Sequence, residues 1–198
     1  MLGSDGAFPH LKLELALNKV LRVPWIRWQA ACVELSQGDL AMLSTLKEPT
    51  VATLTVQTLL KGAVEVAENQ LTTFVTPLLG FPHLKRWLFY QTKSGPTYWI
   101  QSVEDPKVGF CVVAPFQAGL DPEIDLNGDD VADIGAKNPS DIDVYTMVVL
   151  DKDPAQRRTN LRAPILVCRK TNLAKQVILQ DTRLPIKFFL RDLKPHGN

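Results

Sequence analysis

The residues with the clearest potential for chemistry are the acidic and amide side chains of DLNGDD, residues 125–130. Asp125, Asn127 and Asp129 have the spacing that opens an EF-hand calcium loop. Such a loop also needs a glycine at its sixth position and a bidentate carboxylate at its twelfth, but these positions hold Asp130 and Ala136. We therefore interpret this stretch as a polar turn and helix cap, and we expect no metal site.

Histidine, serine, cysteine and glycine give no reactive constellation either. His83 lies well inside the chain, the other two histidines lie near its ends, and neither a GxSxG nor an HExxH motif occurs. Cys32, Cys111 and Cys168 are far apart and form no CxxC pair, so neither a disulfide framework nor a zinc site is indicated. Glycine-rich phosphate-binding loops are also absent from the sequence. The sequence therefore predicts a protein without catalytic residues or cofactors.

Charge is unevenly distributed along the chain, although the formal net charge is only +1. Residues 121–143 contain eight acids against Lys137 alone, and residues 152–198 contain eleven Lys and Arg against three Asp. The basic region could contact phosphates, so an RNA-binding β module is the alternative to a protein-binding domain. However, strand alternation would scatter these charges over two faces, and no aromatic RNA-binding signature is present. We therefore expect no direct contact with nucleic acid.

The elements that would position these residues are short strands. From residue 53 onward, runs such as TLTVQTLL, RWLFYQT, TYWIQSV and VYTMVVLD are rich in β-branched and aromatic residues, and turn-forming residues separate them. This rhythm predicts a mainly β protein: a compact antiparallel β-barrel-like domain over residues 53–192. One short helix is expected through residues 130–133, capped by Asn127 or Asp129. A polar tail, residues 193–198, follows the domain.

Residues 1–52 lack the regular pattern of short strands that begins at residue 53, and they are predicted to form an amino-terminal extension. The run LKLELALNKVL spaces four apolar residues as a short amphipathic helix would: Leu13, Leu17, Val20 and Leu21. Met42 offers an alternative biological start, and the intact mass of protein from the native host would decide between the two. No run of eighteen apolar residues and no secretory pattern occurs. We therefore expect a cytoplasmic protein that does not bind membranes.

Four stretches, taken in order over residues 53–192, resemble the bacterial flagellar assembly factor family FliW. They are PLLGFPHLKRWLFY, PTYWIQSVEDPKVGFCVVAPF, RTNLRAPILV and KQVILQD. The first resembles a Gly-Leu-Pro-Gly-Phe turn before a strand, and the third resembles a Thr-x-Asn-Leu-x-Ala-Pro-Ile signature. The chain departs from the family pattern at Leu79, which replaces the usual turn proline, and at Ala114 and Arg158. The extension is not part of the pattern.

The resemblance implies a monomeric protein with two alternating protein partners. FliW-like proteins bind newly made flagellin. When flagellin has been exported, the freed protein binds the RNA-binding repressor CsrA and relieves the silencing of flagellin messenger RNA. We expect exposed apolar residues to line a groove for the amphipathic helices of flagellin, and acids to face the basic surface of CsrA. The predicted contact residues are Leu79, Gly80, Phe81, Ile100, Asp125, Asp129, Asp130, Asn160 and Leu161.

Overall fold

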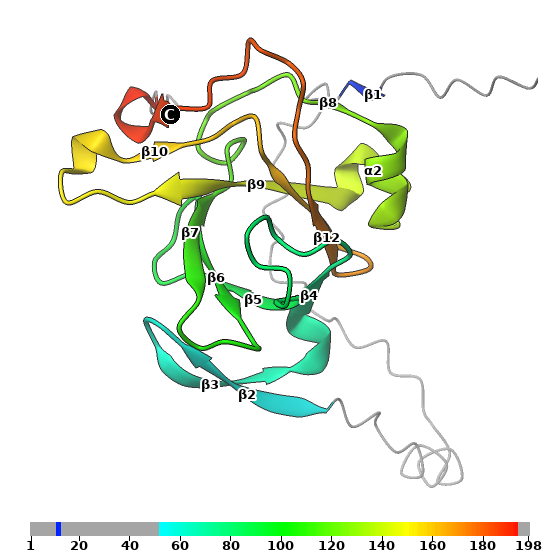
Figure 1. Cartoon of the computed structure of the whole chain (residues 1–198), viewed down its shortest axis with the longest axis vertical. Coiled ribbons are helices and arrows are strands. Elements are labelled where there is room, and N and C mark those ends of the chain that lie inside the picture. Colours follow the sequence, from blue (N-terminus) through cyan, green and yellow to red (C-terminus); the bar gives the residue numbers. More distant parts are fainter. Residues whose placement is uncertain (1–10, 13–51, 194–198) are drawn as a thin grey trace, which may run out of the picture.

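Seven strands form a closed barrel in the computed structural model, which describes residues 11–12 and 52–193 (Figure 1). Around the barrel the strand order is β11, β12, β4, β5, β6, β7 and β9, and a second pairing of β9 with β11 closes the ring. Their bounds are β4 Leu71–Phe74, β5 Arg86–Tyr90, β6 Thr97–Ser102, β7 Gly109–Val113, β9 Ile142–Val149, β11 Ile165–Cys168 and β12 Leu173–Gln176. The predicted mainly β, barrel-like fold is confirmed.

Smaller elements decorate the barrel. The hairpin of β2 (Thr53–Thr58) and β3 (Gly62–Ala67) packs against one end, and β10 (Arg158–Thr159) and β13 (Phe188–Phe189) extend the sheet beyond β9. β1 (Leu11–Lys12) pairs with β8 (Asp125–Leu126) in a separate two-stranded sheet. The single α-helix of the described residues, α2, spans Gly128–Asp133, and four 3-10 turns complete the fold.

One pairing differs from the all-antiparallel expectation. β12 runs parallel to β4, with Leu173 opposite Thr73 and Ala174 opposite Phe74, whereas the other described strand pairs are antiparallel. Parallel neighbours cannot be joined by a tight hairpin, and nearly 100 residues separate these two strands along the chain. This non-local contact joins the two halves of the barrel.

The sequence of β11 is continuously apolar and does not alternate with polar residues. Ile165 and Val167 point into the barrel, where they join Trp87 and the other interior residues. Leu166 and Cys168 point to the outer face, where they belong to a second cluster beneath α2 and the carboxy-terminal segment. Both faces of β11 are therefore buried, so a continuous apolar run replaces the half-polar pattern of a strand with one solvated face.

The predicted helix is confirmed, and its cap is Asn127, whose Oδ1 accepts a hydrogen bond from the backbone N–H of Asp129 at 3.2 Å. Gly135 follows the helix with φ +69°, a conformation that favours glycine. In the predicted amphipathic stretch, Leu11 and Lys12 form a strand, while the helical positions 13–21 and Met42 lie outside the described residues. No helix in the described ranges is long and apolar enough to cross a membrane.

Candidate functional site

An open groove of about 1290 Å³ lies between α2 with β8 on one side and the segment that follows β12 on the other. Val131, Ile178 and Leu179 give it an apolar lining, and Asp125 and Asp129 stand exposed among its residues. This volume exceeds the roughly 300–1,000 Å³ of small-molecule pockets, so the groove suits a segment of polypeptide better than a metabolite. No group of three or more potential metal ligands occurs among residues 11–12 and 52–193.

Lys175 fixes α2 to the barrel. Its Nζ lies 2.7 Å from a carboxylate oxygen of Asp130 and 2.7 Å from one of Asp133, and its side chain is 19% exposed. The hydrogen bonds from Lys175 to Asp130 and Asp133 raise the pKa of the lysine, so the ammonium stays charged. The negative charge of Asp130 is therefore largely neutralised within the molecule. Asp129 and Asp125 also line the groove, and both are exposed.

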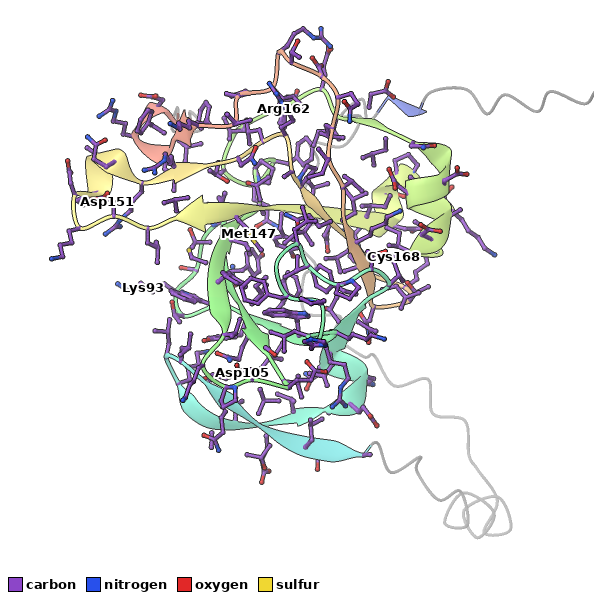
Figure 2. The ribbon with its side chains drawn as sticks, viewed as in Figure 1. Lys93, Asp105, Met147, Asp151, Arg162 and Cys168 are labelled. Carbon is purple, nitrogen blue, oxygen red and sulfur yellow. The ribbon has the colours of Figure 1, made fainter. Side chains whose placement is uncertain are left out.

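The other wall of the groove is held by residues 160–162. Asn160 Oδ1 accepts a hydrogen bond from the backbone N–H of Arg162 at 3.0 Å, and the backbone N–H of Leu161 donates to the Pro185 carbonyl at 3.1 Å. Arg162 (labelled in Figure 2) donates to the carbonyls of Thr182 and Leu184, both at 3.1 Å. These contacts anchor the segment that carries Asp181 and Arg183. Asn160 and Leu161 thus support this wall of the groove but are not among the residues that line it.

The turn of residues 78–81 forms a separate surface. Leu79 is 67% exposed, and Gly80 has φ +89°, which explains the glycine in this turn. Phe81 is half-buried, with its ring 5.1 Å from that of Phe110. The Leu79 backbone N–H donates to Gln176 Oε1 at 3.4 Å. Because neighbouring residues of a strand point to opposite faces, Gln176 and Lys175 place the turn and α2 on opposite faces of β12.

The acid-rich and basic regions of the sequence are set against each other. Arg169 pairs with Asp143 at 2.8 Å, Lys170 with Asp141 at 2.9 Å, and Arg183 with Glu123 at 3.8 Å. Arg183 also pairs with Asp181 of its own region at 2.7 Å. Arg162 and Lys175 make the contacts described above. Much of the positive charge that suggested phosphate binding is therefore already paired, and this disfavours a continuous basic surface for RNA.

The Lys170–Asp141 pair gives a testable pH dependence. The hydrogen bond from Lys170 holds the pKa of Asp141 below its ordinary value. A carboxyl whose pKa is depressed on folding stabilises the protein above its unfolded pKa, and this contribution disappears as the pH falls through the folded value. We expect Lys170→Met to lower the free energy of unfolding at pH 7, where the pair contributes fully, and to move the acid-unfolding midpoint to a higher pH. Circular dichroism between pH 2 and 7 measures this, with Lys93→Met as control. Equal midpoints would contradict the prediction.

The family described as "FliW protein" matches residues 53–190, which comprise the whole barrel and both walls of the groove. The chain belongs to the FliW family. The flagellar assembly factor FliW of Clostridium botulinum is 38% identical over 130 residues, covering 65% of this chain and 92% of that protein. The FliW of Caldicellulosiruptor saccharolyticus is 32% identical over 129 residues, covering 65% of this chain and 85% of that protein.

A solved FliW structure has the same fold. The crystal structure of the flagellar assembly factor FliW aligns with a TM-score of 0.65 and 28% identity, and the match covers 69% of this chain and 96% of that chain. The expected resemblance to the FliW family is thus confirmed. The amino-terminal extension lies outside the region that the family match covers.

Two of the predicted FliW contact residues are corrected by their burial. Ile100 is 0% exposed and belongs to the barrel interior, because it lies within β6 and not in a loop. Leu161 is 5% exposed and packs in the cluster beneath α2, so its role is to position the groove wall. Neither residue is therefore exposed as a surface contact residue would be, and the expected exposure of Ile100 in a loop is wrong. Leu79, Asp125 and Asp129 are exposed and stay candidates for contact.

Sequence reasoning missed the apolar lining of the FliW groove. Ile178 is 52% exposed, although its run KQVILQ has the composition of a buried strand. Its exposure follows from its position just beyond β12, where the chain has left β4. Val131 is half-buried on α2, and the sequence offered one indication of it, because Val131 is the large apolar residue of a helix that contains three aspartates.

Proposed function

We propose that this FliW protein is a flagellar assembly factor that binds flagellin in the cytoplasm and, when free of it, binds and antagonises the translational repressor CsrA. It acts by binding and not by catalysis. The observation that carries the proposal is the family match across the entire barrel, since its relatives are named flagellar assembly factors. Flagellin synthesis would thereby be coupled to flagellin export.

The groove is the proposed flagellin site. The ends of flagellin are amphipathic helices, and such helices bind by laying an apolar face into a groove. Val131, Ile178 and Leu179 supply the apolar surface, and the volume is large enough for part of a helix. Lys175 on one wall and Arg162 on the other hold the groove in a preformed shape. A preformed groove reduces the ordering cost of binding.

The exposed acids at the same groove are the proposed approach surface for CsrA. A protein that binds RNA must present positive charge, which Asp125 and Asp129 would attract. If CsrA docks beside its RNA path, these acids repel phosphate, so that binding of this protein and of RNA weaken each other reciprocally. Because flagellin and CsrA would share one surface, each also weakens the other's binding.

Two assays test the proposal. Purified chain is titrated with flagellin and with CsrA by calorimetry, and translation of a reporter with the flagellin leader is measured in vitro with CsrA present. We expect complexes with both partners, relief of repression on adding the chain, and renewed repression on adding flagellin. Binding to the leader RNA without CsrA would instead support the RNA-binding alternative. Absence of both complexes would overturn the proposed function.

Neutralising the groove acids gives a sharper prediction for CsrA. The double variant Asp125→Asn/Asp129→Asn leaves the Lys175 ion pairs intact and should weaken CsrA binding about threefold to tenfold at low salt. The loss should shrink above about 0.5 M salt, because ions screen exposed charges. The matched control is Glu65→Gln/Glu68→Gln on the hairpin end, which removes the same charge from exposed positions elsewhere. Equal affinities for the two double variants, measured by stopped-flow or calorimetry, would rule out this electrostatic role.

A further inference from the structure

β8, which lines the groove, already has a strand paired with it. Leu11–Lys12 of the extension runs antiparallel to Asp125–Leu126, with Leu11 opposite Leu126 and Lys12 opposite Asp125. Figure 1 shows this pair beyond the barrel, close to α2. The extension is also the part of the chain that the family match leaves out. A segment outside the family match therefore pairs with an element of the candidate site.

The register of this pair sets which positions of β1 and β8 lie opposite each other. Leu126 is 3% exposed and belongs to the cluster beneath α2, whereas Asp125 is exposed. In the backbone register, position 11 therefore lies opposite the buried residue of β8 and position 12 lies opposite the exposed one. A slip of one residue would exchange the two faces. The backbone pairing of β1 with β8 thus involves both residues of β8.

We infer that Leu11–Lys12 is an intramolecular strand that occupies the edge of β8 and competes with a protein partner for the groove. Asp125 and Leu126 both line the groove, so a partner seated there meets the strand with which β1 pairs. A free strand edge invites addition of an extended segment, and β1 satisfies that edge from within the chain. A two-residue pairing is marginal by itself, so a partner can displace it at small cost.

The connection to the barrel makes such a weak contact effective. Residues 13–52 join β1 to β2, and a chain of that length can span up to roughly 130 Å when extended. Because β1 and the groove belong to one chain, docking of β1 is intramolecular and does not depend on protein concentration. A displaced β1 stays attached and can return. The apparent affinity of the groove for a partner is reduced by the fraction of molecules in which β1 is docked.

A disulfide cross-link tests the docking. In the full-length Cys32→Ser chain, Lys12→Cys/Asp125→Cys places two thiols at opposite positions of the pair, within the range that a disulfide requires. The control, Lys12→Cys/Asp153→Cys, carries its second cysteine between β9 and β10. We expect intramolecular oxidation at least about tenfold faster in the first variant, independent of protein concentration. Equal rates, or linked dimers in place of monomers, would overturn the inference.

The competition rests on the proposed function and is measured on the same molecule. The oxidised Lys12→Cys/Asp125→Cys chain should bind flagellin at least about tenfold more weakly than its reduced form, while the same treatment of Asp153→Cys/Lys12→Cys should change nothing. Equal affinity of the oxidised and reduced forms would refute competition at the groove. If neither form binds flagellin, the proposed function fails and the competition fails with it. The docking of β1 is judged separately, by the cross-linking rates.

Discussion

Replacing Trp87 by alanine is expected to lower the free energy of unfolding by about 3–5 kcal/mol, the loss typical of a fully buried aromatic side chain. Trp87 is 0% exposed and lies in the middle of the barrel. Its ring centroid is 6.1 Å from that of Phe74 and 5.9 Å from that of Phe110. The truncation removes apolar contact with both neighbours and leaves a cavity in a closed barrel. A domain of this size has only about 5–15 kcal/mol to lose.

Urea denaturation followed by far-ultraviolet circular dichroism measures this loss, and two further variants calibrate it. Trp99→Ala removes the same side chain from a half-buried position in β6 and should cost clearly less. Trp87→Phe should also cost less than Trp87→Ala, because Trp87 Nε1 has no hydrogen-bond partner among the described residues and the phenyl ring keeps much of the packing. Equal losses for Trp87→Ala and Trp99→Ala would show that the barrel interior is not the main source of stability.

The strands were predictable from the sequence because their signal is local. Runs of β-branched and aromatic residues between turn residues indicated the main strands, and the DLNGDD stretch indicated the helix and its cap. β8 and β10 were not predicted, since each has only two residues and no pattern of its own. The parallel pairing of β12 with β4 was also beyond local reasoning, because it depends on how the barrel closes.

Ile100 was predicted to be an exposed loop residue, but it is a buried residue of β6. It lies in TYWIQS, where positions 100–102 are all buried and the alternation expected of a half-solvated strand is lost. The β2–β3 hairpin covers the outer face at this point: the backbone N–H of Leu59 donates to Gln101 Oε1 at 2.9 Å, and Gln101 is 1% exposed. Leu59 and Gln101 are 42 residues apart in the sequence, so the sequence of β6 alone does not indicate that the hairpin covers it.

The candidate site was only half predictable for the same reason. The sequence indicated an acid-rich stretch, and two of its acids, Asp125 and Asp129, are exposed as a charged surface requires. Their pairing was not visible: Asp130 is neutralised by Lys175, which is distant in sequence and adjacent only in the fold. The groove itself exists because residues 160–162 hold the carboxy-terminal segment opposite α2.

Ile178 is the residue whose replacement should affect flagellin binding most. It lines the groove and is 52% exposed, so a partner can bury the half that solvent reaches now. Ile178→Asp removes that apolar contact and places a carboxylate where the apolar face of a helix would lie, which costs desolvation without a compensating ion pair. We expect a loss of about 2 kcal/mol or more, or at least roughly thirtyfold in the dissociation constant.

Ile186→Asp is the matched control for this prediction. Ile186 is 55% exposed and follows the same carboxy-terminal segment, but it is not among the residues that line the groove. The two substitutions remove the same side chain, add the same charge and begin from nearly equal exposure, so thermal unfolding should shift alike in both. Calorimetric titration with flagellin should then separate them: strong weakening for Ile178→Asp and wild-type affinity for Ile186→Asp. Wild-type affinity in both variants would place the flagellin site elsewhere, with the exposed turn at Leu79 on the opposite face of β12 as the next surface to mutate.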